Sequence, residues 1–154
     1  MSSPRIVARP VENSLVSIPR RWSIEIDGIR WLPRMIDKAR MSASGKLGAY
    51  LIGHSPVDGA LLRRLGLTTQ EFVAIANAHA DDASVLQMLR DRMDEGRVRR
   101  WSGNFERTYA RYIWMWDIDE GYRRPNLLQR FALGIYRPLE GGISTLLRKV
   151  LRAP

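Results

Sequence analysis

The chain has 154 residues, and its 25 Lys and Arg outnumber its 16 Asp and Glu to give a formal net charge of +9 at pH 7. This length predicts a single domain with a sizeable core, and a composition of 45% hydrophobic and 27% charged residues excludes wholesale disorder. Cysteine is absent, which excludes disulfides, thiolate metal sites and cysteine nucleophiles. No apolar run is long enough for a signal peptide or a membrane span, so the expected location is the cytoplasm.

The positive charge is unevenly distributed along the chain. The formal net charge is +4 over residues 1–40, −2 over residues 41–95 and +7 over residues 96–154, and only three of the basic residues are lysine. Arginine is favoured where phosphate or carboxylate is recognised bidentately. Codon bias in a GC-rich genome gives the same excess, and it is the explanation that composition alone favours.

The first segments carry the weakest structural signals. Residues 1–20 contain Ser, Pro and Arg without a sustained period, so they are expected to form an N-terminal arm, loosely ordered or lying across the domain. Residues 21–154 are expected to form one helical domain. Apolar residues alternate around Asp27 and Gly28, a pattern typical of a small β-hairpin. A turn that leads directly into the next helix explains this pattern equally well, because an isolated hairpin is marginal in water.

The remaining segments have helical periodicity or helical boundaries. Thr68 and Glu71 form a capping-box signature, and Asp82 is expected to cap the helix after it. Helices are therefore predicted over residues 33–42, 57–65, from 68 onward, 82–95, 104–117, 127–136 and 143–152. The stripe in residues 104–117 is aromatic and is expected to be the heaviest core element, with Phe105, Tyr109, Tyr112 and Trp116 inward. The predicted fold is all-α, a compact bundle of about six or seven short helices with or without the N-terminal hairpin.

The first predicted helix carries the densest set of functional groups. Arg34, Asp37 and Arg40 recur at three-residue intervals, and Lys38 lies four residues after Arg34. Asp37 either orders the neighbouring cations as a charge anchor, or orients an anion site formed by the three cations. An exposed, salt-bridged helix face also explains the spacing, and spacing alone favours it.

Four stretches form a recognisable set of motifs: residues 31–40 (WLPRMIDKAR), 45–51 (GKLGAYL), 56–58 (PVD) and 61–67 (LLRRLGL). In these stretches the chain resembles a bacterial family of uncharacterised proteins, known only as domain of unknown function 5069. The resemblance is strong from Gly28 to about Leu89 and weak from there to Gly121. It implies a small helical domain and makes four positions worth testing, Arg34, Asp37, Lys38 and Asp58, but it implies no established activity.

Relatives in this family can carry cysteine before the Pro-x-Asp step, where this chain has Ser55. A thiol role would therefore not carry over. Other templates also fail: residues 40–47 lack the first Gly and the final Ser or Thr of a P-loop. His54 and His79 are the only histidines and lack metal-binding spacing, and residues 117–121 supply too few ligands for an EF-hand. We predict no metal site and no cofactor, and assign no catalytic residue.

The basic C-terminal third is a second candidate surface. If its aromatic stripe belongs to the core, the basic side chains that remain could contact nucleic-acid phosphates without reading sequence. They are Arg97, Arg99, Arg100, Arg148, Lys149 and Arg152. The segment 143–152 is amphipathic and could also lie on an anionic membrane, although docking on the body of the protein is the preferred interpretation because the segment is short.

Three functions remain open from the sequence. The preferred hypothesis is a binding module for a small anionic or phosphorylated ligand, held by Arg34, Asp37, Lys38, Arg40 and Asp58. The first alternative is non-specific nucleic-acid binding through the basic ends. The second is an enzyme that uses Asp37 or Asp58 as general acid or base. The sequence does not predict the oligomeric state.

Overall fold

The computed structural model describes residues 18–130. The predicted helix over 143–152, with Arg148, Lys149 and Arg152, lies outside these residues, as does the arm before residue 18. Only the first turn of the predicted 127–136 helix, residues 127–130, is described, and it is helical.

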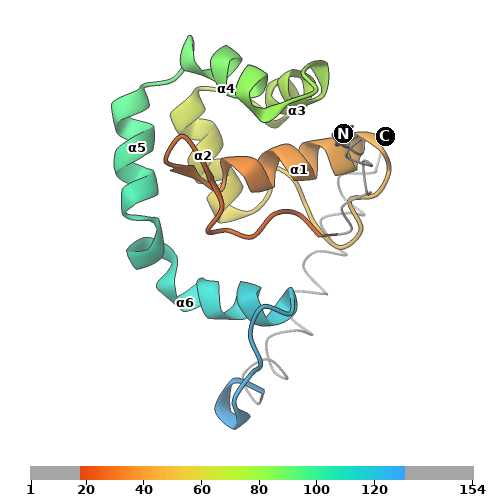
Figure 1. Ribbon diagram of the computed structural model, residues 1–154, viewed down its shortest axis with the longest axis vertical. Coiled ribbons are helices and arrows are strands. Elements are labelled where there is room, and N and C mark those ends of the chain that lie inside the picture. Colours follow the sequence, from red (N-terminus) through yellow and green to blue (C-terminus); the bar gives the residue numbers. More distant parts are fainter. Residues whose placement is uncertain (1–17, 131–154) are drawn as a thin grey trace, which may run out of the picture.

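Within residues 18–130 the chain forms a two-stranded hairpin and then six helices, which precede the helical turn at residues 127–130. These are β1 (Glu25–Ile26), β2 (Ile29–Arg30), α1 (Leu32–Ala43), α2 (Pro56–Leu65), α3 (Thr69–Ala78), α4 (Asp82–Arg90), α5 (Glu95–Gly103) and α6 (Phe105–Asp119). Helix α1 crosses the middle of the molecule, α3 and α4 lie above it, α5 descends along one side and α6 runs below (Figure 1). The predicted, mostly helical fold is confirmed. None of the helices in the described part of the chain is long and apolar enough to cross a membrane.

The hairpin confirms the first of the two expectations for the segment after the arm. Ile26 pairs with Ile29 in antiparallel register, and Asp27 and Gly28 both have positive φ, at 49° and 73°. Positive φ at both central residues is the geometry of a type I′ turn. Ser102 of α5 supports this short hairpin, because its Oγ accepts a hydrogen bond from Arg30 N at 2.8 Å and donates one to Gly28 O at 2.7 Å.

Side chains cap the starts of α2, α3, α4 and α5, but not those of α1 and α6. The Thr68–Glu71 capping box is present at the start of α3. Helix α4 is capped by Asp81, whose carboxylate accepts the Ser84 N–H at 2.8 Å. The expectation that Asp82 is the cap is therefore wrong. The carboxylate of Asp82 instead binds the guanidinium groups of Arg20 and Arg40.

Helix α5 was not predicted. Asp94 caps it by accepting the Arg97 N–H at 2.9 Å. Only Val98, Trp101 and Ser102 are buried along its length, which is too sparse for a hydrophobic period. Glycines near both of its ends also look like stop signals in the sequence. Packing against α2 and the hairpin, rather than periodicity, accounts for this helix.

The core is an aromatic cluster around Phe105, which is fully buried. Its ring lies 4.7 to 6.4 Å, centroid to centroid, from the rings of Trp22, Trp31, Trp101, Tyr109 and Trp116. The predicted aromatic stripe is thus mostly confirmed, but Tyr112 is 37% exposed. Tyr109 has non-helical dihedral angles (φ −109°, ψ 15°), so α6 is kinked there and the stripe does not stay on one face.

Candidate functional site

The polar side chains of α1 are buried, which corrects the expectation of an exposed, salt-bridged face. Arg34, Asp37 and Lys38 are all buried, and only Arg40 is half-exposed. Helix α1 is surrounded by residues 18–22, α2, α3, α4 and the end of α6, so its polar face meets other segments instead of solvent.

Lys38 and Asp58 form the most deeply buried of these contacts. Lys38 Nζ lies 2.5 Å from Asp58 Oδ2. The Asp58 carboxylate also accepts the Trp31 Nε1–H at 2.8 Å and the Gly53 N–H at 2.9 Å, so three donors satisfy it. Burial lowers the pKa of Lys38, and the neighbouring Asp58 opposes that effect. Ser55 caps α2 and positions Asp58 in its first turn.

Arg34 is bound by the residue that follows α6. Both terminal nitrogens of its guanidinium contact the Glu120 carboxylate, and Nη1 also donates to Arg20 O at 2.9 Å. The guanidinium carbon lies 5.1 Å from the ring centroid of Trp31 and 5.4 Å from that of Tyr50. Burial raises the pKa of Glu120, although its bonds to Arg34 act in the other direction.

Asp37 and Arg40 belong to a network centred on Arg20. The Asp37 carboxylate accepts three hydrogen bonds of 2.8 Å from Arg20, one from its backbone N–H and two from its guanidinium. Arg20 Nη1 also binds Asp82, which in turn accepts Arg40 Nη1 at 3.0 Å. Burial opposes ionisation of Asp82, but the hydrogen bonds and charges of Arg20 and Arg40 keep its pKa below the ordinary value.

The five residues predicted as a ligand site therefore lie in three ion-pair networks. The cations Arg34, Lys38 and Arg40 each have an acidic partner from another segment. Asp37 and Asp58 are ion-paired as well. These contacts join α1 to its neighbours, and the ligand-binding and acid/base roles of the five residues stay predictions.

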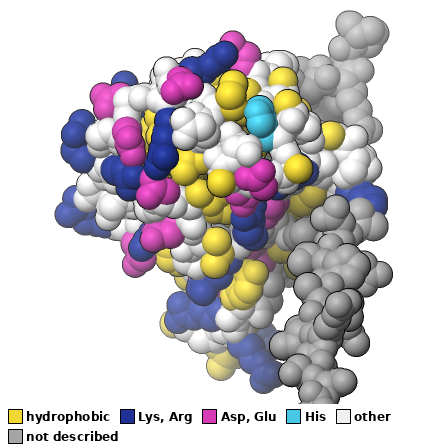
Figure 2. Space-filling view, turned by 45° about the horizontal axis from the view of Figure 1, so that its top comes forward, with side chains coloured by type: hydrophobic (Ala, Val, Ile, Leu, Met, Phe, Trp, Pro, Cys, Tyr) yellow, Lys and Arg dark blue, Asp and Glu magenta, His cyan; other side chains and the backbone are white. Residues whose placement is uncertain are grey.

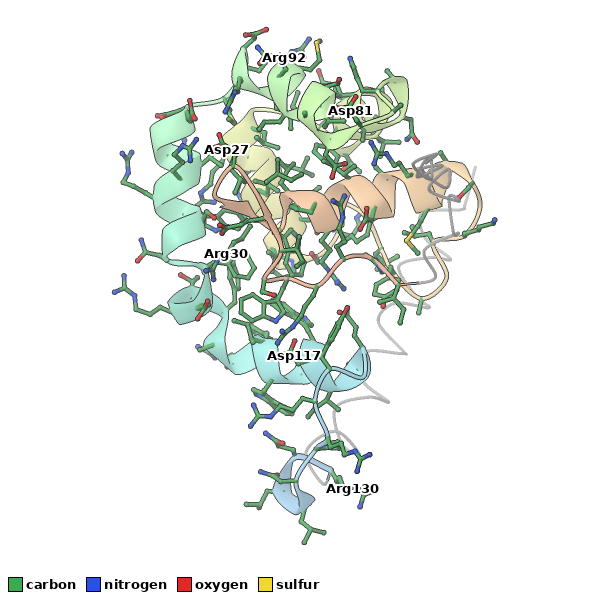
Figure 3. All side chains as sticks on the ribbon, in the orientation of Figure 1. Asp27, Arg30, Asp81, Arg92, Asp117 and Arg130 are labelled. Carbon is green, nitrogen blue, oxygen red and sulfur yellow. The ribbon has the colours of Figure 1, made fainter. Side chains whose placement is uncertain are left out.

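A fourth network ties the segment before the hairpin to α6. Asp117 points from α6 toward that segment (Figure 3), where it accepts bonds from Arg21 at 2.6 and 2.8 Å and from Trp22 Nε1 at 2.9 Å. The hydrogen bonds from Arg21, which are the largest effect, and from Trp22 lower the pKa of Asp117. Arg21 and Trp22, at the start of the predicted helical domain, are thus held against α6.

A different set of cations lies on α2 and α5, two helices that pack against each other. Arg63 and Arg64 are in the last turn of α2, whereas Arg97 and Arg100 are one turn apart on α5. Within residues 18–130 none of the four forms an ion pair with a carboxylate. We call these four residues the arginine cluster.

Arg64 is the least satisfied member of the cluster. Its Nη1 donates to Ala60 O at 2.7 Å and its guanidinium carbon lies 5.3 Å from the Trp101 ring centroid. Its Nε is the one buried side-chain polar atom without a partner in the part of the chain that the structure describes. Burial lowers the pKa of Arg64, and repulsion from Arg97 and Arg63 adds to this effect. The positive charges of Arg63, Arg64 and Arg97 thus lie near one another without a carboxylate of residues 18–130 to neutralise them.

Two glycines make room for the cluster. A Cβ at Gly59 would lie 3.3 Å from Arg63 Nη1, and a Cβ at Gly96 would lie 3.3 Å from Arg100 Nη1. In each case the glycine precedes the arginine by four residues, one helical turn, so the guanidinium lies along its own helix. This Gly-x-x-x-Arg spacing occurs in both helices and is the sequence signal that could have identified Arg63.

Three residues of the predicted nucleic-acid patch, Arg97, Arg99 and Arg100, lie within the described part of the chain, and the role of the patch stays a prediction. Arg97 and Arg100 are in the arginine cluster, but Arg99 binds Asp27 and Glu95 at 2.6 and 2.7 Å. Asp27 lies at the tip of the hairpin beside α5 (Figure 3). Lys and Arg side chains project at the left edge of the molecule, over α5, with acidic side chains among them (Figure 2).

The comparisons with known proteins identify the family but not an activity. The family model described as "Domain of unknown function (DUF5069)" matches residues 16–127, which is most of the chain. The chain therefore belongs to this family, as the motifs in its first half predict. No curated protein and no solved structure matches it. In residues 18–130 no three His, Asp or Glu side chains are grouped as a metal site would require.

Proposed function

We propose that the protein binds phosphate groups through the arginine cluster on α2 and α5. Phosphate is the anion that suits these side chains, because guanidinium groups donate paired hydrogen bonds to its oxygens. The ligand class is the one that the sequence analysis prefers, but the residues differ. Arg34, Lys38 and Arg40 already have carboxylate partners, whereas the cluster has none among the described residues.

The observation that carries the proposal is that Arg64 is partly buried beside other arginines and has a side-chain N–H without a hydrogen-bond partner. A buried N–H without a partner costs about 1–3 kcal/mol, and here it belongs to a guanidinium that lies near the like charges of Arg63 and Arg97. An anion beside the cluster reduces the repulsion between these like charges. The Arg64 guanidinium lies over the Trp101 ring, which itself packs edge to face against Phe105 with 5.3 Å between the ring centroids.

The test compares two double variants with the same change in net charge. Arg63→Gln/Arg97→Gln neutralises two of the three exposed members of the cluster, while Arg92→Gln/Arg124→Gln neutralises two exposed arginines elsewhere. We expect pyrophosphate and a short oligonucleotide to raise the melting temperature of the wild type and of the control. The cluster variant should respond much less. Equal responses of the two double variants, or no response of the wild type, would contradict the proposal.

A further inference from the structure

The basic surface continues from the arginine cluster onto α6. Arg107 Nη2 donates to Asn104 Oδ1 at 2.6 Å, and Asn104 Nδ2 donates to Arg100 O at 2.8 Å. Arg107 is thereby held at the junction of α5 and α6, beside the turn that carries Arg100. Arg111 follows one turn later on α6, and neither Arg107 nor Arg111 forms an ion pair with a carboxylate of residues 18–130.

These arginines extend further than a small ligand does. From Arg97 to Arg111 the chain is helical except at the junction and the kink, and α5 and α6 run in different directions (Figure 1), so these arginines are spread over two helices. One phosphate or pyrophosphate contacts only part of such a surface. A ligand with repeated phosphates contacts all of it.

An exposed aromatic ring lies at the end of this surface. Tyr112 is 37% exposed, with the Arg111 guanidinium carbon 5.9 Å from its ring centroid and the Trp116 ring stacked 6.2 Å away. The kink at Tyr109 takes Tyr112 out of the core. Exposed aromatic rings beside arginines are how proteins bind single-stranded nucleic acids, because the rings stack on bases while the arginines contact phosphates.

We infer that the phosphate-bearing ligand is a single-stranded nucleic acid that follows α5 and α6, with a base stacked on Tyr112. This inference rests on the proposed function, since the arginine cluster supplies part of the phosphate contacts. A duplex offers the same phosphates, but its bases already stack on one another and are not available to the ring. Stacking is tolerant of sequence, so binding should have little base preference.

The experiment measures fluorescence anisotropy of a labelled single-stranded oligonucleotide and of a duplex of the same length, at several salt concentrations. The wild type should bind the single strand more tightly, with an affinity that falls steeply with salt. Tyr112→Leu should weaken binding of the single strand about tenfold and leave duplex binding unchanged. Tyr112→Phe keeps the ring and should bind like the wild type, which separates loss of stacking from loss of folding.

The outcomes distinguish the inference from the proposed function. If Arg63→Gln/Arg97→Gln weakens all binding but Tyr112→Leu affects single strand and duplex alike, or neither, the inference is wrong and the function stands. Tighter binding of the duplex by the wild type also overturns the inference. If no nucleic acid and no phosphate compound binds the wild type, the proposed function itself fails.

Discussion

Lys38 and Asp58 are bound to each other in the interior, with Nζ 2.5 Å from Oδ2 and with side chains that are 4% and 0% exposed. Burying both charges costs desolvation energy that their attraction offsets only when the remaining hydrogen bonds are also made. Here they are made, because Trp31 and Gly53 donate to the same carboxylate.

Removing one partner of this pair should destabilise the protein strongly. Lys38→Met and Asp58→Leu each leave an uncompensated buried charge, with an expected loss of about 3–5 kcal/mol in the free energy of unfolding. Asp58→Leu should be the more damaging, since it also leaves the N–H groups of Trp31 and Gly53 without an acceptor. The double variant should lose less than the sum of the two single losses, which urea denaturation of the four proteins measures. Additive losses would contradict the pairing.

Gly53 is expected to tolerate no side chain. Its φ is +78°, and a Cβ there would lie 2.0 Å from Thr69 Oγ1. Gly53→Ala should therefore combine backbone strain with a steric clash and destabilise the protein by about 2–4 kcal/mol. Gly45→Ala is the matched control, because Gly45 has φ +70° and open space around it. Its loss should be only about 1–2 kcal/mol. Thermal unfolding compares the two, and Thr69→Ala should partly rescue Gly53→Ala.

Arg20 should matter more for stability than its half-exposed side chain suggests. It binds Asp37 and Asp82 and so joins α1 to the start of α4. Arg20→Met leaves the buried Asp37 without its cation, and we expect a loss of about 2–3 kcal/mol. Introducing Asp37→Asn into the Arg20→Met protein should recover part of this loss. If Arg20→Met unfolds at the wild-type urea concentration, the contact contributes nothing to stability.

Asp117 should contribute to unfolding in acid. Its pKa is lowered in the folded protein, so near pH 4 the unfolded chain binds more protons than the folded chain. The stability that Asp117 contributes is therefore complete above its unfolded pKa of about 4 and is lost as the pH falls through its lower folded value. Stability curves from pH 7 to pH 2 should be flatter at the acid end for Asp117→Asn. Asp91→Asn, at an exposed carboxylate, should keep the wild-type slope.

Local sequence signals predicted the elements that depend on local chemistry. The Asp27-Gly28 turn and the Thr68–Glu71 capping box each involve neighbouring residues only, and both are confirmed. Helix α5 depends instead on packing against α2 and the hairpin. The hydrophobic pattern within the nine residues of α5 does not indicate this packing.

The burial of the polar face of α1 also depends on contacts that are distant in the sequence. Helical spacing identified the charged residues correctly, but their partners are 17 to 86 residues away in the sequence. No spacing rule places Glu120 beside Arg34 or Asp82 beside Arg40. Arg64 was overlooked because the property that distinguishes it, a buried N–H without a partner, exists only once α2 and α5 are packed together.

The separate partners of α1 have a consequence for how this family evolves. Each charged residue of α1 forms an ion pair with an oppositely charged side chain from another part of the chain; these residues are Arg34, Asp37, Lys38 and Arg40. A change at any one of these α1 positions leaves the charge of its partner uncompensated. A relative that lacks one residue of an ion pair is therefore expected to have a substitution at the other residue of that pair. In an alignment of relatives, positions 20 and 37 should then covary, and so should positions 34 and 120.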